Sequence, residues 1–289
     1  MQIKNEQRLK NKVTIITGGA GGIGSTIVDR FIAEGAKVIS ADITEIKHKK
    51  KPDFFYFRTD IRDPASVKKL IKKTLTLFGT IDILINAAAV QKPIGPLTDI
   101  SEKDWINCII TNLIGTMLCC KHVLPTMISN KKGKIINFSG GGATFPRPNY
   151  SAYASSKAAI VRFTETLSEE VRDHGIDVNS IAPGSVYTNM LKEIIHAGKI
   201  RGGKDYAGAL GIKSKGGDSP VHAANLCVYL ASDFSDGITG KLISAVWDNW
   251  KDFDKNILGI KNSSLYTLRR VDGEKVIEIK NTKIIQNYG

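Results

Sequence analysis

The chain has 289 residues, of which 42% are hydrophobic and 24% are charged, and 41 basic side chains against 28 acidic ones give it a net charge of +13. This composition is typical of a soluble globular protein and excludes disordered and fibrous chains. The N-terminal residues lack the apolar run and the cleavage site of a secretory signal, and no stretch reaches the roughly 20 apolar residues of a membrane span. We therefore expect a cytoplasmic protein that does not bind a membrane.

The excess positive charge is spread along the chain and forms no basic block. We therefore expect no nucleic-acid partner, and the alternative of a basic nucleic-acid binder predicts strongly salt-dependent retention on DNA. The four cysteines are Cys108, Cys119, Cys120 and Cys227. Their spacing matches no zinc site, so we expect buried free thiols and no metal.

Short apolar runs alternate with amphipathic stretches through most of the chain. In chain order they predict strands over 13–17, 36–41, 54–59, 81–86, 134–139, 177–182 and 240–246, and helices over 23–33, 64–78, 102–127, 152–173 and 220–231. Local signals support two of these helices: Ser151 as an N-cap with Gly175 as the stop, and Ser219 followed by Pro220. The alternation predicts an α/β fold built on a doubly wound parallel sheet.

Two segments depart from this alternation. Residues 184–217 are rich in glycine and lysine, with one helix predicted near 189–196, and long insertions of this kind are usually functional. In the C-terminal tail, Tyr266–Val271 and Glu274–Ile279 flank an Asp-Gly dipeptide, which predicts a β-hairpin packed on the body or on another subunit. We expect a single domain over 1–250 that contains the insertion, followed by an extension over 251–289.

A glycine-rich turn, residues 17–24, lies between the first predicted strand and the first predicted helix. Glycine lets a pyrophosphate approach the backbone, and the following helix offers unpaired N–H groups, although a merely flexible loop would look the same. Asp42 ends the second strand, eighteen residues after Gly24. A carboxylate at this position accepts hydrogen bonds from an adenosine ribose and repels a 2′-phosphate, which favours NAD over NADP, unless Asp42 is a solvated turn residue.

Tyr153 and Lys157 are spaced i and i+4, so they share one face of the predicted helix. An ammonium beside a phenol stabilises the phenolate, which would let the tyrosine exchange a proton with a substrate hydroxyl near neutral pH. Taken alone, the same spacing also fits a pair on the protein surface.

Taken together, several motifs resemble the short-chain dehydrogenase/reductase family. They are T-G-x-x-x-G-x-G at 17–24, N-A-A at 86–88, Asn112 in a helix, Tyr153 with Lys157, and Pro183-Gly184 with Thr188. Their order and spacing match the family through about residue 246. The resemblance implies a Rossmann fold and hydride transfer between a nicotinamide cofactor, here NAD, and an alcohol or ketone.

The resemblance also implies roles for individual residues. The implied cofactor contacts are Gly18, Gly22, Ile23 and Gly24 at the pyrophosphate, Asp42 at the adenosine ribose, Asp60 and Ile61 at adenine, Asn86, Ala87 and Ala88 beneath the cofactor, and Pro183, Gly184, Val186 and Thr188 at the nicotinamide end. Tyr153 would be the general acid/base, Lys157 would hold the nicotinamide ribose and lower the tyrosine pKa, and Asn112 would position a proton-relay water.

Two departures from the family pattern stand out. The family usually has a serine thirteen residues before the tyrosine, and here that position is Gly140, with Ser139 one residue earlier. Ser139 is the first candidate for the missing hydroxyl, and Thr144, Asn149 or a backbone N–H are alternatives. In addition, residues 244–248 read S-A-V-W-D where the family commonly ends V-D-G-G.

For the substrate, the loop before Tyr153 contains Arg147 and Asn149, which are suited to a polar or anionic small molecule. Our hypothesis is a sugar or nucleotide sugar, and the alternatives are a 3-oxoacyl thioester or a catalytically weak or silent NAD-binding regulator or scaffold. Family members usually pair into homodimers or homotetramers through the helix that carries the tyrosine. The apolar residues of that helix, Ile160, Val161, Phe163 and Leu167, suit such pairing and equally suit burial against its own sheet.

Overall fold

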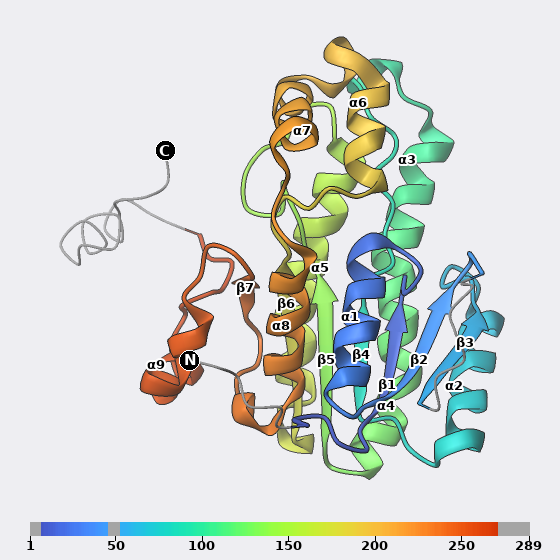
Figure 1. Cartoon of the computed structure of the whole chain (residues 1–289), viewed down its shortest axis with the longest axis vertical. Helices are drawn as coiled ribbons and strands as arrows, with labels where there is room; N and C mark the ends of the chain where they lie inside the picture. Colours follow the sequence, from blue (N-terminus) through green and yellow to red (C-terminus); the bar gives the residue numbers. More distant parts are fainter. Residues whose placement is uncertain (1–6, 46–52, 271–289) are drawn as a thin grey trace.

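A parallel sheet of seven strands forms the centre of the protein in the computed structural model, which describes residues 7–45 and 53–270 (Figure 1). The strands are β1 (Val13–Thr17), β2 (Lys37–Asp42), β3 (Phe54–Arg58), β4 (Ile83–Asn86), β5 (Gly133–Phe138), β6 (Ile176–Ala182) and β7 (Leu242–Ser244). Their order in the sheet is β3-β2-β1-β4-β5-β6-β7, and all neighbours pair in parallel. The winding reverses between β1 and β4, so the predicted doubly wound Rossmann fold is confirmed.

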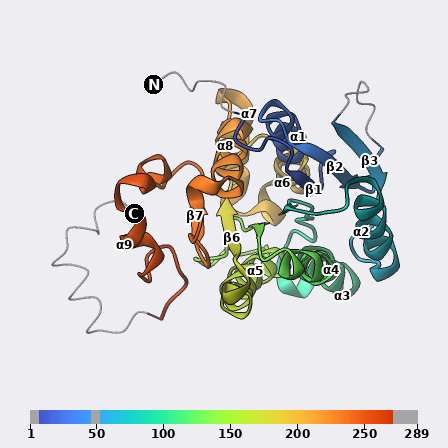
Figure 2. The ribbon, with the colours of Figure 1, turned by 90° about the horizontal axis from the view of Figure 1, so that it is seen from below.

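Helices cover both faces of the sheet (Figure 2). α1 (Gly22–Ala33) and α8 (Pro220–Ala231) pack together on one face, and α2 (Pro64–Phe78), α4 (Gly115–Ser129) and α5 (Ser151–Glu170) cover the other. Along the strands, Ile16 and Ile136 are buried on the α1/α8 side, whereas Ile15 and Ile135 are buried on the opposite side. Because both faces are covered, each central strand is apolar throughout, which is why continuous apolar runs predicted these strands.

Residues 102–129 form one long helical stretch, made of α3 (Glu102–Ile109), a π-helical turn (Ile110–Ile114) and α4. Within the described residues it is the one helix long and apolar enough to cross a membrane by length and composition, and 44% of its apolar window is buried inside the protein. Core helices of soluble proteins share these properties. Leu118, Cys119 and Val123 pack into the core beneath the sheet, so we assign the stretch to the core.

Helix starts agree with the sequence at some positions and differ at others. The Ser219 side chain accepts a hydrogen bond from the Val221 N–H, with Pro220 in the first turn, as predicted. The prediction for Ser151 is wrong, because Tyr150 occupies the N-cap position and Ser151 is the first residue of α5. The Ser151 hydroxyl instead accepts a hydrogen bond from the Trp105 indole at 3.1 Å, which joins α5 to α3.

The insertion after β6 contains two helices where the sequence predicts one. α6 (Asn189–Gly202) extends beyond the expected end at 196, and α7 (Lys204–Lys215) follows directly. Gly198, with φ of +75°, kinks α6, and Gly203, with φ of +57°, separates the two helices. Ala209 is the one buried residue of α7, so this helix lacks the apolar stripe by which a helix is recognised in a sequence.

The described part of the C-terminal extension packs against the body. After β7 the chain forms a 3₁₀ helix (Trp250–Asn256) and a short α9 (Ile257–Lys261), and Trp250, Phe253 and Ile260 join the core on the α1/α8 side. Residues 266–270 form no strand, which corrects the predicted start of the hairpin, and the remainder of the predicted hairpin lies outside the described residues. The Leu242 N–H in β7 donates to the Tyr266 carbonyl at 2.7 Å, so this segment covers the edge of the sheet.

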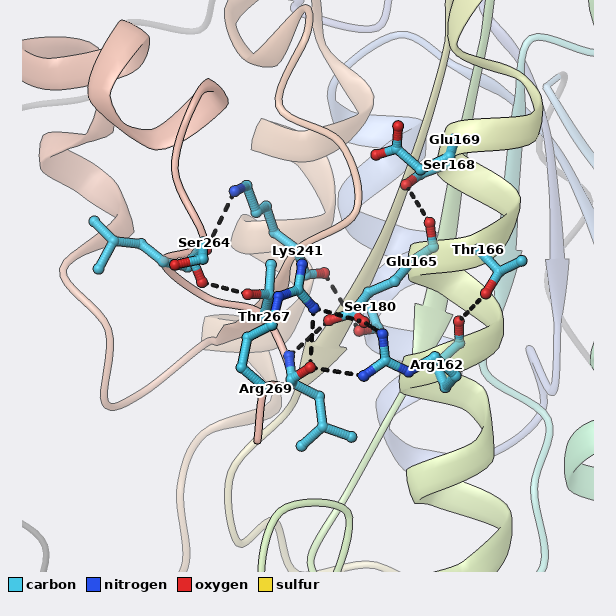
Figure 3. Close-up of polar contacts among 12 residues, drawn as sticks. Arg162, Glu165, Thr166, Ser168, Glu169, Ser180, Lys241, Ser264, Thr267 and Arg269 are labelled. Carbon is cyan, nitrogen blue, oxygen red and sulfur yellow. Dashed lines mark hydrogen bonds and ion pairs between the residues drawn. The ribbon is translucent and has the colours of Figure 1, made fainter. Parts of the chain in front are cut away.

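The extension is also fastened to α5 by a buried carboxylate (Figure 3). Glu165 accepts hydrogen bonds from the Leu268 N–H at 2.6 Å and from Arg269 at 3.2 Å, and it forms an ion pair with Arg162. The Lys241 ammonium donates to the carbonyls of Ser263 and Leu265 from the sheet edge. Since α5 also carries Tyr153 and Lys157, the extension supports the helix on which the candidate site is built.

Candidate active site

The glycine-rich turn lies at the carboxyl end of β1 and leads into α1. A Cβ atom on Gly24 would lie 2.1 Å from the Gly18 carbonyl oxygen, and a Cβ on Gly18, whose φ is +70°, would lie 2.7 Å from the Ala88 backbone. The N-cap of α1 is Gly21, which has no side chain to occupy the first N–H groups of the helix. The turn therefore presents bare backbone and the positive end of a helix dipole, a chemistry suited to a pyrophosphate.

Asp42 lies beside this turn at the end of β2. Its Oδ2 accepts a hydrogen bond from the Ala20 N–H at 3.0 Å, and its Oδ1 accepts one from the Thr44 N–H at 2.9 Å. These contacts fix the orientation of a carboxylate that is partly exposed. A ribose hydroxyl can still donate to the fixed carboxylate, so the position fits the adenosine side of a dinucleotide.

The two residues predicted to meet adenine are engaged within the protein. The Asp60 carboxylate pairs with the Arg62 guanidinium at 2.7 Å, and hydrogen bonds from Arg62 lower the pKa of Asp60. The Ile61 side chain is buried, and its Cδ1 would lie 2.7 Å from a Cβ placed on Gly115. The adenine contacts of Asp60 and Ile61 remain a prediction.

Asn86 ends β4 and connects two strands beneath the turn. Its amide nitrogen donates to the Asn137 side-chain oxygen at 2.9 Å, in the register that pairs the ends of β4 and β5. The Ala88 N–H donates to the Thr17 hydroxyl at 3.3 Å. The Asn86–Ala88 segment is thereby held against the glycine turn and forms part of the floor of the site.

Tyr153 and Lys157 lie in the first two turns of α5, and both are buried, at 7% and 2% exposure. The Lys157 ammonium donates to the Phe138 carbonyl at 2.7 Å and lies 5.6 Å from the centre of the Tyr153 ring. This carbonyl belongs to the last residue of β5, so the pair lies at the carboxyl ends of the strands, the same edge of the sheet at which the glycine turn lies. The burial of both residues argues against a surface pair.

Burial changes the acidity of both groups. It raises the pKa of Tyr153 to about 12, while the Arg147 guanidinium acts to lower it. Burial also lowers the pKa of Lys157 to about 8. Both shifts have the same cause, since a low-dielectric environment disfavours the charged form of each group. A phenolate on Tyr153 therefore requires positive charge nearby.

The structure gives a physical reason for glycine at position 140. A Cβ atom on Gly140 would lie 2.5 Å from the Tyr153 hydroxyl oxygen, so the phenol occupies the space that a side chain would need. The neighbouring Ser139 hydroxyl is buried and has no hydrogen-bond partner in the described structure. An unpaired buried hydroxyl is costly unless a ligand or a water molecule completes it.

Asn112 lies in the π-helical turn that interrupts the α3–α4 stretch, and turns of this kind are frequent at functional sites. Its amide nitrogen donates to the Val90 carbonyl and to the Ser156 hydroxyl, both at 2.9 Å, and its oxygen accepts from the Val90 N–H. The residue joins α5 to the loop after β4. Apolar periodicity did not reveal the π-helical turn, and the water-relay role of Asn112 remains a prediction.

The segment after β6 forms the wall next to the glycine turn. Gly184 has φ of +88°, and a Cβ there would lie within 2.7 Å of both Val246 and Asp218. Val186 is largely buried, and Thr188 is the N-cap residue of α6. The Thr188 methyl lies 3.4 Å from the Cβ position of Gly22. Pro183, Gly184, Val186 and Thr188 thus begin a wall that meets the start of α1.

The two residues predicted to contact substrate lie between α5 and the insertion. The Arg147 guanidinium pairs with Asp205 of α7 at 2.5 Å, and the Asn149 amide donates to the carbonyls of Ile200 and Arg201. Asn149 therefore holds the end of α6, and its direct contact with substrate remains a prediction. No local sequence pattern indicates Asp205 as a partner, because it lies 58 residues from Arg147.

The parallel sheet, the bare glycine turn and a buried phenol–ammonium pair at one sheet edge define a dinucleotide-dependent oxidoreductase of the doubly wound class. The chain belongs to the short-chain dehydrogenase family, since the sequence model described as short chain dehydrogenase matches residues 12–198. Members of this family use nicotinamide cofactors and act on CH–OH groups. The chain is therefore a short-chain dehydrogenase/reductase.

Individual relatives cover most of the chain. It is 35% identical over 248 residues to subunit BbsD of (2S)-[(R)-hydroxy(phenyl)methyl]succinyl-CoA dehydrogenase from Thauera aromatica, covering 81% of this chain and 95% of the relative. It is 32% identical over 246 residues to the 3-oxoacyl-[acyl-carrier-protein] reductase of Thermotoga maritima, covering 82% and 96%. Ligand-free aldohexose dehydrogenase from Thermoplasma acidophilum has a similar structure, with a TM-score of 0.72, 28% identity and coverage of 82% and 92%.

Proposed function

We propose that the protein is an NAD-dependent oxidoreductase that interconverts a secondary alcohol and a ketone, with Tyr153 as the general acid/base. The observation that carries this proposal is the burial of Tyr153 and Lys157 together at the sheet edge that holds the glycine turn. In the oxidative direction the Tyr153 phenolate accepts the proton of the substrate hydroxyl, and in the reductive direction the phenol returns it. The bound nicotinamide supplies or accepts the hydride.

The choice of NAD is supported by Asp42. Its carboxylate is already fixed by two backbone N–H groups beside the glycine turn, and a 2′-phosphate there would meet its negative charge. Residues 17–24 contain no lysine or arginine to compensate for that phosphate. Lys157 would hold the nicotinamide ribose, and Val186 and Thr188 would lie at the nicotinamide amide.

Ser139 is proposed to donate a hydrogen bond to the reacting oxygen of the substrate. Its buried hydroxyl has no partner in the described structure, and it is adjacent in the chain to Gly140, where a Cβ atom would lie 2.5 Å from the Tyr153 hydroxyl oxygen. Ser139→Ala should lower kcat by about 10²-fold, the usual effect of removing one donor to a developing oxyanion, with little change in KM. An unchanged kcat would assign the contact to Thr144, Asn149 or a backbone N–H.

For the substrate we propose a sugar or nucleotide sugar. Support comes from the polar side chains of Arg147 and Asn149 in the wall of the site and from the similarity to an aldohexose dehydrogenase. A second candidate is a 3-oxoacyl thioester, favoured by the similarity to 3-oxoacyl-[acyl-carrier-protein] reductases. A panel of sugars, nucleotide sugars and acyl thioesters, followed by NADH absorbance, distinguishes them, and turnover of thioesters alone would reject the sugar hypothesis.

Tyr153→Phe tests whether the protein is an enzyme at all. Loss of turnover with retained NAD binding would support the proposed role of Tyr153. Equal residual rates in the parent and in Tyr153→Phe would favour a catalytically silent NAD-binding regulator or scaffold. Binding of NAD is measured separately, by quenching of tryptophan fluorescence, so that a folding defect is not mistaken for a catalytic one.

We also propose a cytoplasmic homodimer or homotetramer. Ile160, Val161 and Leu167 of α5 are buried within the chain, so they are not available for pairing. Two isoleucines of the α3–α4 stretch, which packs beside α5, are exposed instead: Ile106 with 52% and Ile110 with 37% of its surface accessible to solvent. Light scattering of the parent and of Ile110→Glu tests this surface: dissociation of the variant supports the proposal, and a monomeric parent rejects it.

A further inference from the structure

Two cations lie close to the ring of Tyr153. The Lys157 ammonium is 5.6 Å from the ring centre, and the Arg147 guanidinium carbon is 5.3 Å from it. Lys157 comes from the same helix as the tyrosine, whereas Arg147 comes from the loop between β5 and α5. The second cation therefore belongs to a separate structural element and has its own supports.

Arg147 is fixed by contacts from several directions. Its Nε pairs with the Asp205 carboxylate at 2.5 Å, its Nη2 donates to the Gln91 side-chain oxygen at 3.3 Å, and its guanidinium lies 3.9 Å from the centre of the Tyr150 ring. The Gln91 amide in turn donates to the Met190 carbonyl in α6. With 13% of its side chain exposed, Arg147 is held largely out of solvent by the α6–α7 insertion and by the loop after β4.

We propose that Arg147 is a positioning residue that stabilises the ionised form of Tyr153, and that the α6–α7 insertion holds it there through Asp205. The inference rests on the proposed function, because an ionised Tyr153 matters only if this residue moves the proton. A cation about 5 Å from a buried phenol favours the phenolate, and poor screening in the interior strengthens the effect.

Of the titratable groups around Tyr153, Lys157 and Arg147 are the ones that stabilise its ionised form. Burial raises the pKa of the Cys108 thiol, which faces Tyr153 from α3, to about 11, so the thiol is neutral at pH 7. Burial likewise raises the pKa of Tyr150 to about 12. Lys157 and Arg147 carry the positive charge, and Asp205 from α7 offsets part of the charge on Arg147. We therefore expect an effect near one pH unit, at the lower end of the usual range for a neighbouring charge.

The coupling has a functional consequence. The cation that promotes ionisation of Tyr153 depends on a carboxylate from the insertion that forms the wall of the substrate site. When the insertion is displaced, Arg147 loses its ion pair with Asp205 and is held less firmly against the phenol ring. The position of the insertion and the ionisation of Tyr153 are thereby linked through the Arg147 side chain.

The test measures ionisation of Tyr153 directly, without a substrate. The full chain is labelled with ¹³C at tyrosine Cζ and titrated by NMR with saturating NAD⁺, and the resonance absent from Tyr153→Phe identifies the residue. Arg147→Gln should raise the titration midpoint by about one pH unit, and Arg147→Lys should restore part of the shift. Arg201→Gln removes a cation from the same insertion that does not contact Tyr153, so it should leave the midpoint unchanged.

Asp205→Asn tests the second half of the inference and remains informative if Arg147→Gln fails to fold. It should move the midpoint upward by less than Arg147→Gln does. A downward shift would mean that Asp205 acts only as a counter-charge, and it would overturn the role of the insertion. A folded Arg147→Gln protein whose midpoint stays within about 0.2 pH unit of the parent would overturn the role of Arg147. A different result, unchanged turnover in Tyr153→Phe, would refute the proposed function itself.

Discussion

The lack of space for a side chain between Gly140 and Tyr153 makes a sharp prediction about the departure from the family serine. Gly140→Ala adds one methyl group at a position 2.5 Å from the Tyr153 hydroxyl oxygen and 3.3 Å from its ring carbon Cζ. Tyr153 is buried, and its ring is bordered by Arg147 and Lys157, so the phenol has little room to move aside. Gly140→Ser makes the same collision, although it restores the residue type typical of the family.

The size of the effect follows from the distance. To reach ordinary van der Waals separation the phenol oxygen must move by roughly 1 Å, and a misplacement of this size costs about 10²-fold in rate. A 10²-fold loss corresponds to about 2.7 kcal/mol in the activation free energy. The loss should fall on kcat more than on KM, because the phenol acts in proton transfer and contributes little to substrate affinity.

The matched control is the next glycine in the chain. A Cβ on Gly141 would meet nothing nearer than the Arg147 side chain at 3.9 Å, so Gly141→Ala should keep nearly the parent activity. Both variants are assayed by NADH absorbance with the best substrate of the panel, and circular dichroism checks their folding. Equal kcat values for Gly140→Ala and the parent would refute the argument, because the phenol would then tolerate the displacement.

Three further predictions concern cofactor choice, stability and the extension. Asp42→Asn removes a charged acceptor, so the ratio of kcat/KM for NAD to that for NADP should fall by about 10-fold to 100-fold, and an unchanged ratio would contradict the ribose role. Lys157→Met should abolish turnover yet raise the free energy of unfolding at pH 7 by up to about 3 kcal/mol in urea unfolding, because burial lowers the pKa of this ammonium from 10.5 to about 8. Between these two pH values the unfolded chain keeps the proton that the folded chain has lost. The stabilisation by the substitution should therefore be full below pH 8 and absent near pH 10.5. Glu165→Ala should cost about 1–3 kcal/mol, because it leaves the Leu268 N–H without its acceptor and removes the ion pairs of Arg162 and Arg269. The same change at the exposed Glu169 should cost under about 0.5 kcal/mol, and equal losses would disprove the role of Glu165 as a buried link between α5 and the extension.

The sequence by itself determined the sheet, the glycine turn and the helix that carries Tyr153 and Lys157. These features depend on local patterns: continuous apolar runs for strands buried on both faces, glycines where backbone must approach closely, and an i, i+4 spacing on one helix. Each pattern lies within about twenty residues and has the same physical meaning in any protein. The family motifs can therefore be assigned from the sequence alone.

The tertiary structure decided what those patterns leave open. Glycine at position 140 has its reason only in the distance to Tyr153, and Arg147 acquires its place through Asp205, which is 58 residues away. Helix α7 and the fastening of the extension to Glu165 had no local signal, because one buries a single residue and the other joins segments more than 100 residues apart. Contacts of this kind arise only when distant segments pack together, and sequence periodicity does not record which segments will meet.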